Sequence, residues 1–293
     1  MIKSLCCIAC LLIFISAIAQ PYPPGKVLRI SSSHSMFPDS LRNAQPRVYN
    51  GKTYSAAQHY SDSSVFIFVP DYFDQKKPMN LVFWFHGWSS NIDTSLVKFQ
   101  LVEQFYASQR NAIFIFPEGP KNAPDSYGGK LETKAEFYKL GRDVLPYIPS
   151  EKVFGFSTKQ AKETLFPITI TLAGHSGAYR VMGKILANGS PIEEVFLFDG
   201  LYGEIEAYQS FAVKQPQKRF INIYTDNGGT KQNSLDFLLQ LDSLNVPYLH
   251  KEEDALTTED LKTNRIIFLH SKMGHNEVIT NNSNFERFLK KDY

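Results

Sequence analysis

The sequence predicts a three-layer α/β/α sandwich, in which helices cover both faces of a mostly parallel sheet of about eight strands. One observation is a series of short, continuous apolar runs, which are typical of strands buried on both faces. Another is that stretches with helical spacing separate most of these runs, and strands that alternate with helices form parallel βαβ units. The length of 293 residues allows one large domain or two small ones. The apolar runs are residues 65–69, 81–85, 112–116, 168–172, 195–198, 220–224 and 265–269.

Helices are expected between the runs, and antiparallel strands at the start make the expected sheet a mixed one. No internal repeat or interdomain linker interrupts the pattern, so residues 61–293 are expected to form a single domain. The segment from Gly200 to Gln217 is short, which argues against a large cap domain. The stretches with helical spacing are residues 94–107, 133–145, 178–187, 232–244 and 283–290.

Residues 20–60 are expected to form an N-terminal extension that ends in a hairpin. The part from Gln20 to Pro46 is rich in proline and serine and is typical of a tail or a surface wrap. The hairpin is predicted over residues 48–54, because Asn50-Gly51 suits the positive-φ positions of a type I′ turn.

Residues 1–19 have the pattern of a cleavable signal peptide. Lys3 is followed by an apolar run from Leu5 to Ile18, which is short for a membrane span. Ala17-Ile18-Ala19 supplies the small-x-small pattern, so cleavage is predicted after Ala19, with an uncleaved anchor as the alternative. The expected location is therefore secreted or periplasmic, with no stable membrane span after cleavage. All three cysteines, Cys6, Cys7 and Cys10, would be removed, which leaves no disulfide or thiol nucleophile.

Composition excludes several classes of protein. A hydrophobic content of 43% with a net charge of only +2 is unlike a disordered chain. The balance of 31 basic against 29 acidic residues gives no electrostatic basis for binding nucleic acid.

Ser176 lies in a motif that is typical of a catalytic nucleophile. The run 168–172 leads into Gly174–Ala178 (GHSGA), and helical spacing follows from Tyr179. A sharp strand-to-helix turn of this kind needs small residues two positions before and two after the serine. The backbone N–H of Gly177, at the start of a helix, would point at an oxyanion beside Ser176. The alternative is a glycine-rich turn that carries a solvated serine.

With this motif, residues from about 60 to 290 resemble the α/β-hydrolase superfamily, in particular its serine esterases and lipases. The resemblance implies the α/β-hydrolase fold and a serine, acid, histidine triad in that chain order. It also implies a second oxyanion donor, the backbone N–H of Gly87 or Trp88, which follow the strand-ending His86. His86 itself is expected to be structural.

The triad histidine is expected after the last strand, where two candidates lie. His270 follows the run directly, whereas His275 lies farther out, on a loop that can fold back over the site. We favour His275. A metal pair of these two histidines lacks a carboxylate at metal-ligand spacing. Neither a metal nor another cofactor is therefore expected.

Two aspartates compete for the acid of the triad. Asp199 ends the run 195–198, and Asp226 follows the run 220–224. In the superfamily the second of these positions is the commoner one, but the longer apolar flank of Asp199 would desolvate its carboxylate. We favour Asp199 and keep Asp226 as the alternative, since either residue could instead cap a helix or a turn.

The mouth of the site is expected to contain Tyr127, Lys130, Trp88, Tyr179 and Tyr202, of which Tyr127, Lys130 and Tyr202 are the candidate substrate-binding residues. The resemblance implies a serine hydrolase that cleaves carboxylic esters through an acyl-enzyme. Small-molecule or polymer-attached esters are the expected substrates, such as acylated polysaccharide or short acyl esters. The alternatives are a peptidase or amidase with the same triad and a non-catalytic binding protein on the same scaffold.

Overall fold

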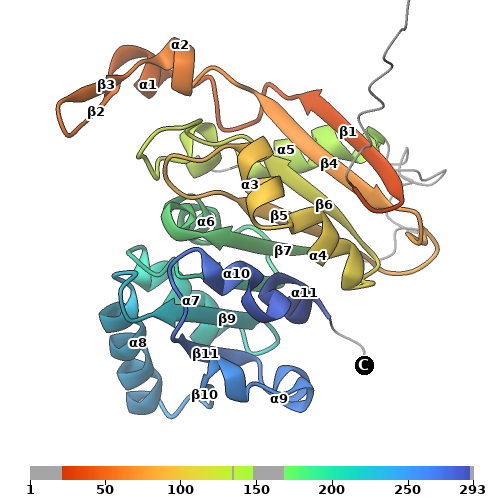
Figure 1. The fold of residues 1–293 in the computed structure, drawn as a ribbon, viewed down its shortest axis with the longest axis vertical. Helices are drawn as coiled ribbons and strands as arrows, with labels where there is room; N and C mark the ends of the chain where they lie inside the picture. Colours follow the sequence, from red (N-terminus) through yellow and green to blue (C-terminus); the bar gives the residue numbers. More distant parts are fainter. Residues whose placement is uncertain (1–21, 134, 148–167, 291–293) are drawn as a thin grey trace, which may run out of the picture.

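A nine-stranded sheet forms the centre of the part of the chain that the structure, a computed structural model, describes: residues 22–133, 135–147 and 168–290. Its strand order is β1-β4-β6-β5-β7-β8-β9-β11-β10 (Figure 1). β4 pairs antiparallel with β1 and with β6, and the other pairs are parallel. The strands are β1 (Gly25–Ser31), β4 (Ser64–Pro70), β5 (Met79–Phe85), β6 (Ala112–Pro117), β7 (Ile168–His175), β8 (Glu194–Phe198), β9 (Arg219–Thr225), β10 (Leu249–Glu252) and β11 (Ile266–Ser271).

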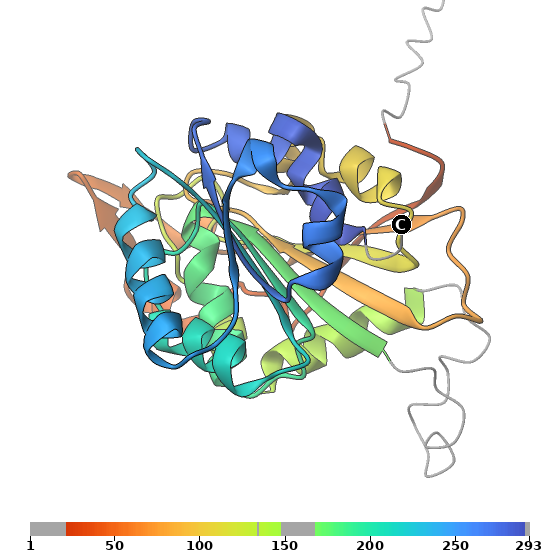
Figure 2. The ribbon, with the colours of Figure 1, turned by 90° about the horizontal axis from the view of Figure 1, so that it is seen from below.

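Helices cover both faces of this sheet, as expected (Figure 2). One face carries α5 (Glu136–Val144), α6 (Tyr179–Ala187), α7 (Ile205–Lys214) and α8 (Lys231–Ser243). The other carries α3 (Ile92–Lys98), α4 (Leu101–Ala107), α9 (Thr258–Thr263), α10 (Glu277–Thr280) and α11 (Asn284–Leu289). The segment from 200 to 217 contains only α7, which packs on the sheet.

The alternation of side chains along the central strands explains the two cores. In β5, Leu81, Phe83 and Phe85 join the apolar cluster on the α5–α8 side, whereas Val82 and Trp84 join the cluster on the opposite side. Because both faces are buried, the strand has no polar positions in its apolar run, and this is why such runs could be recognised in the sequence.

The N-terminal extension differs from the expected tail or wrap. Residues 25–31 form β1, which pairs with β4 along its whole length and lies at the edge of the main sheet. β1 is only partly buried, so its sequence lacks the continuous apolar character of the central strands. Two short helices follow, α1 (Ser40–Ala44) and α2 (Ala56–His59).

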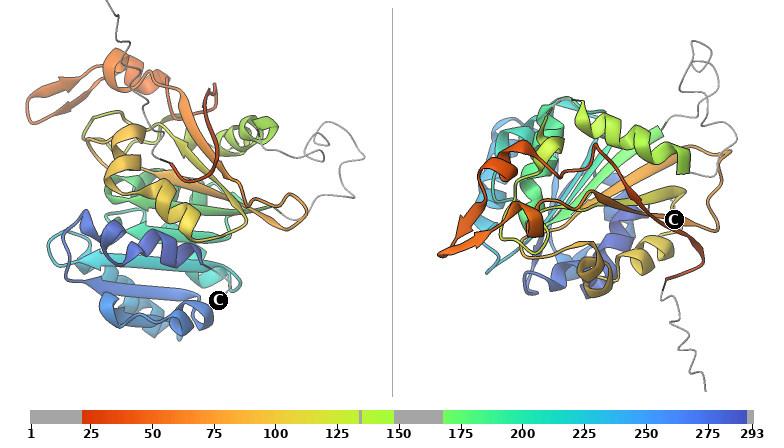
Figure 3. Two further views of the ribbon diagram at one scale, coloured as in Figure 1. Left: turned by 45° about the vertical axis from the view of Figure 1, so that its right-hand side comes forward. Right: turned by 90° about the horizontal axis from the view of Figure 1, so that it is seen from above.

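The predicted hairpin lies between those helices, as β2 (Arg47–Tyr49) and β3 (Lys52–Tyr54). Asn50 and Gly51 have φ angles of 47° and 73°, as a type I′ turn requires. The hairpin projects from the body of the domain (Figure 3).

The predicted helix 94–107 is wrong as a single helix. Gln100 has a φ angle of 49°, which separates α3 from α4. The predicted signal peptide and its cysteines lie outside the described residues. None of the helices in the described ranges is long and apolar enough to cross a membrane.

Candidate active site

Ser176 lies at the turn between β7 and α6 with a φ angle of 55°. This left-handed conformation is rare for a residue other than glycine, and it occurs where the surrounding structure enforces it. A Cβ atom on Gly174 would lie 2.5 Å from Met182 Sδ and 2.7 Å from Ala178 Cβ, so only glycine fits there. The methyl group of Ala178 is accommodated and buried.

The two segments expected to supply the oxyanion donors lie against each other. A Cβ atom on Gly87 would be 2.7 Å from Ser176 Cβ and 3.3 Å from the backbone nitrogen of Gly177. A Cβ atom on Gly177 would in turn be 2.5 Å from the indole ring of Trp88. Both glycines are therefore required for the loop after β5 to approach the serine turn.

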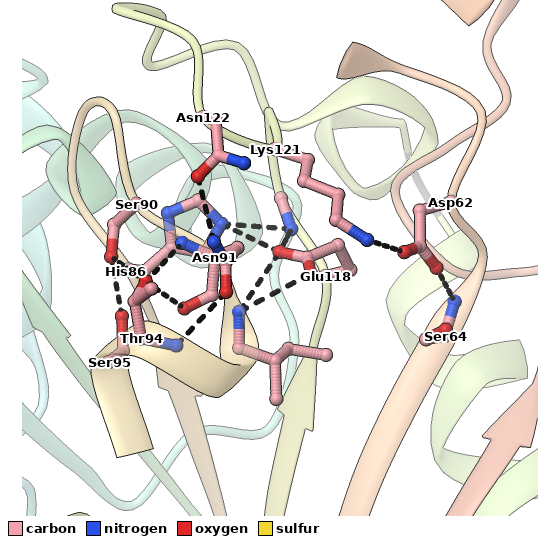
Figure 4. A network of polar contacts seen from close by, with 12 residues as sticks. Asp62, Ser64, His86, Ser90, Asn91, Thr94, Ser95, Glu118, Lys121 and Asn122 are labelled. Carbon is pink, nitrogen blue, oxygen red and sulfur yellow. Dashed lines mark hydrogen bonds and ion pairs between the residues drawn. The ribbon is translucent and has the colours of Figure 1, made fainter. Parts of the chain in front are cut away.

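A buried polar network holds the loop after β5 in place (Figure 4). His86 Nδ1 lies 2.7 Å from the carbonyl oxygen of Gly87, and its Nε2 lies 3.1 Å from Glu118 Oε1. Both oxygens of Glu118 are 3.3 Å from the backbone nitrogen of Ile92, in the first turn of α3. The carboxylate thus connects this loop to the start of α3, which fits the structural role expected for His86.

His275 and Asp199 are brought together. His275 Nδ1 lies 2.6 Å from Asp199 Oδ2, and Asp199 is fully buried. Thr225 donates to this carboxylate from its backbone nitrogen at 3.2 Å and from Oγ1 at 2.8 Å, and the hydroxyl of Thr230 donates as well. Burial by itself would raise the pKa of Asp199, but these hydrogen bonds and the one with His275 lower it below the ordinary value.

Asp226 contacts the other candidate histidine instead. It is exposed, and its Oδ1 lies 3.0 Å from His270 Nε2 and 2.6 Å from Lys231 Nζ. His270 Nδ1 lies 2.8 Å from Glu252 Oε1. The two carboxylates raise the pKa of His270 against the lowering effect of its burial. The structure therefore pairs Asp199 with His275, and it pairs Asp226 with His270.

His175 supports the loop of His275, a contact that the sequence did not predict. His175 Nε2 lies 2.8 Å from the carbonyl oxygen of His275, and the centres of the two rings are 4.5 Å apart. Burial, with a smaller contribution from His275, lowers the pKa of His175 to about 3. The ring is therefore neutral near pH 7 and can donate its Nε2–H to that carbonyl.

Ser176, His175 and His275 line a cleft of about 680 Å³. Tyr202 lies at its wall with its ring centre 6.4 Å from that of His275, and its hydroxyl donates to the carbonyl oxygen of Gly228. Burial, together with the charge of Asp199, raises the pKa of Tyr202 to about 12. The cleft is lined by Gly87, Trp88, Ser89, Ser90, Thr94, Lys98, Phe99, Ser126, His175, Ser176, Gly177, Tyr179, Tyr202, His275 and Asn276.

Tyr127 and Lys130 do not line the cleft, so their expected place at its mouth was wrong. Tyr127 is buried, and its hydroxyl donates to Asp39 at 3.2 Å. Lys130 Nζ donates to the carbonyl oxygen of Ser33 at 2.6 Å. Both side chains are therefore held by hydrogen bonds to residues of the N-terminal extension. Nothing in the sequence pattern indicated that packing.

Seven of the lining residues were not named as site residues from the sequence: Ser89, Ser90, Thr94, Lys98, Phe99, Ser126 and Asn276. Asn276 follows His275 directly, which is the one signal that could have identified it. Within residues 22–133, 135–147 and 168–290, no group of three or more His, Cys, Asp or Glu side chains could hold a metal ion.

Comparisons with known proteins support the architecture. No family model and no curated protein matches the sequence. Solved structures do match, at low sequence identity. One is the fluorophosphonate-binding serine hydrolase F of Staphylococcus aureus, with a TM-score of 0.52 and 14% identity over 92% of this chain and 100% of that one. Another is a ferulic acid esterase, with a TM-score of 0.55 and 12% identity over 91% of this chain and 98% of that one. Together with the strand order, these likenesses show that the chain has the α/β-hydrolase fold.

Proposed function

We propose that this protein is a serine hydrolase that cleaves carboxylic esters by acyl transfer. The observation that carries the proposal is that Ser176, at its strained turn, shares a cleft with His275, whose Nδ1 is held by the buried carboxylate of Asp199. A serine hydroxyl is a weak nucleophile until an oriented, neutral imidazole takes its proton.

In the proposed reaction, Ser176 Oγ attacks the ester carbonyl carbon while His275 Nε2 accepts the hydroxyl proton. The backbone amides of Gly177 and of Gly87 or Trp88 stabilise the oxyanion of the tetrahedral intermediate. The C–O bond to the alcohol then breaks, and His275 returns the proton to the departing oxygen. Water, activated by the same imidazole, releases the acid from the acyl-enzyme.

The open cleft supports substrates with bulky or polymer-attached groups. The segment from 200 to 217 contains α7 as its only helix, so no inserted cap from this segment closes the mouth. Acylated polysaccharide and short acyl esters are therefore the proposed substrate classes. The ferulic acid esterase among the similar structures fits this proposal.

Export is part of the proposal, on the basis of the sequence pattern of residues 1–19. Cleavage after Ala19 would leave Gln20 as the first residue of a secreted or periplasmic enzyme. N-terminal sequencing of the protein purified from an exporting host tests this, and an intact N-terminus beginning at Met1 would contradict it.

A fluorophosphonate probe tests the function. We expect it to label the wild-type protein and not Ser176→Ala, while Ser243→Ala, an exposed control on α8, is labelled normally. Turnover of para-nitrophenyl esters but not of peptide amides identifies an esterase, and the reverse identifies a peptidase or amidase. If the folded wild-type protein is neither labelled nor active, the scaffold serves binding instead.

A further inference from the structure

Lys98 contributes a full positive charge to the cleft, and the cleft lining includes no aspartate or glutamate. Its side chain is exposed and forms no ion pair within the described part of the chain. Asp93, the acid on the same helix, is engaged by Arg29 at 2.6 Å. The Lys98 ammonium group is therefore available to a ligand.

Helical geometry directs Lys98 into the cleft. Thr94 and Lys98 are four residues apart on α3, which places them on the same face of the helix, and both line the cleft. A hydroxyl group and an ammonium group thus lie on one wall.

A series of side-chain contacts connects Lys98 with His275 through Phe99 and His175. Lys98 Nζ is 5.2 Å from the centre of the Phe99 ring, and the Phe99 ring centre is 5.2 Å from that of His175. His175 in turn packs against His275 at 4.5 Å. The Lys98 charge also reaches His175, where it adds to the effect of burial in lowering the pKa of that ring.

Trp88 lines the cleft beside the serine turn. The Trp88 ring lies against Gly177, and its Nε1 donates to Ser126 Oγ at 2.7 Å. Trp88 is 42% exposed, and Tyr49 of the β2–β3 hairpin packs edge-on against it with ring centres 5.3 Å apart. Lys98 and Trp88 therefore offer different chemistry to the two parts of an ester.

We propose that Lys98 binds an anionic group on the alcohol part of the ester. This inference rests on the proposed function, because acyl transfer places the departing oxygen next to the imidazole that protonates it. The alcohol part then lies beside His275, on the side that His175 and Phe99 connect with Lys98, and the acyl part extends toward Trp88. A carboxylate, a sulfate or a phosphate has the required charge. The substrate class is an acyl ester of an acidic alcohol, such as an acidic sugar.

Two pairs of esters test whether the enzyme prefers a negative charge in the alcohol part or in the acyl part of its substrate. Para-acetoxybenzoate and para-acetoxybenzamide differ by one charge in the alcohol part. The para-nitrophenyl monoester of succinic acid and para-nitrophenyl butyrate differ by one charge in the acyl part. The ratio of kcat/KM within each pair is compared between variants, so the intrinsic reactivity of each ester cancels.

In Lys98→Met, we expect the ratio for the alcohol-part pair to fall by about three- to fivefold, the range open to an exposed ion pair. Lys98→Arg should retain the ratio. Lys214→Met, an exposed lysine that likewise ends a helix, serves as the matched control and should leave it unchanged. At about 1 M salt, where the screening length is about 3 Å, the wild-type ratio should also fall. A para-acetoxybenzoate analogue that carries sulfate or phosphate in place of the carboxylate distinguishes the three anions.

An unchanged ratio in Lys98→Met overturns the assignment of Lys98, as does an equal or larger fall for the acyl-part pair. Either result would leave ester hydrolysis intact, because the neutral esters are still turned over. If the wild-type protein hydrolyses none of the esters and Ser176 is not labelled, the proposed function itself fails and the inference with it.

Discussion

Gly228→Ala tests whether the Asp199 carboxylate must stay where it lies. A Cβ atom at residue 228 would be 1.8 Å from Asp199 Oδ2 and 2.5 Å from Asp199 Cγ. Ordinary contacts begin at about 3.5 Å, so the carboxylate or its loop must move by roughly 1.7 Å. Gly228 does not have a positive φ angle, so the substitution acts through this contact and not through backbone strain.

The expected loss of activity follows from the hydrogen bond that the movement breaks. His275 Nδ1 and Asp199 Oδ2 are 2.6 Å apart. If the carboxylate moves, this distance can be kept only if the imidazole also moves from its position. A misplacement of about 1 Å can cost about 10²-fold in rate. Loss of the carboxylate's hold on the histidine costs about 10⁴-fold in a serine protease. We expect kcat/KM for para-nitrophenyl acetate to fall by about 10² to 10⁴-fold.

Steady-state kinetics and urea unfolding are measured on the same preparation, because overpacking by one methyl group also costs about 1–3 kcal/mol of stability. Gly141→Ala is the matched control. A Cβ atom there meets nothing within 4 Å, and the residue lies inside α5. It should keep full activity and gain up to about 1 kcal/mol. A folded Gly228→Ala protein within about threefold of the wild-type kcat/KM would refute the reasoning.

Three further predictions concern the groups around Ser176. Asp199→Asn should lower kcat/KM by about 10⁴-fold, whereas Asp226→Asn should leave it within about threefold, because only the first carboxylate contacts His275. The free energy of unfolding should fall as the pH falls from 6.5 toward 3, because His175 has its pKa lowered to about 3 and the unfolded chain takes up the proton first. His175 contributes at most about 1.4 kcal/mol per pH unit to the dependence of the free energy of unfolding on pH. Glu118→Gln should lower the free energy of unfolding by about 1–3 kcal/mol, because the amide N–H₂ faces buried backbone N–H groups.

Each of these predictions has its own control. Equal losses in the two asparagine variants, measured by kcat/KM, would contradict the pairing of Asp199 with His275. For the pH dependence, urea unfolding is compared with His175→Gln above about pH 4.5, where most carboxylates remain ionised. An unchanged slope in that variant would rule out His175 as the cause. Glu206→Gln, an exposed position on α7, gives the baseline for Glu118→Gln. A similar unfolding midpoint for both would contradict a structural role of the buried carboxylate.

The central fold could be predicted because its strands are buried on both faces. Each of the seven apolar runs lies in a strand, with ends shifted by a few residues. β1 and β10 were missed because they lie at the two edges of the sheet, where only some side chains are buried. The break at Gln100 was missed because the apolar spacing continues across it.

The candidate site could be predicted as far as the ends of the strands. Asp199 and Asp226 follow the neighbouring strands β8 and β9, so strand order alone could not distinguish them. The apolar run before Asp199 did indicate burial, and the structure buries that carboxylate beside His275. Tyr127 was placed wrongly because Asp39, the partner of its hydroxyl, belongs to the N-terminal extension, about 90 residues earlier in the chain. The catalytic roles themselves remain predictions.

The pairing of β1 with β4 has a consequence for the solubility of shortened chains. A strand edge with unpaired N–H and C=O groups is a template for pairing with another molecule. β4 is seven residues long and almost entirely buried and apolar, and β1 covers that edge. At the opposite edge, β10 is only four residues long and carries Lys251 and Glu252, which makes it a poor template. A chain that begins at residue 61 would contain every residue proposed to act in catalysis, and yet it would expose β4 and aggregate through it.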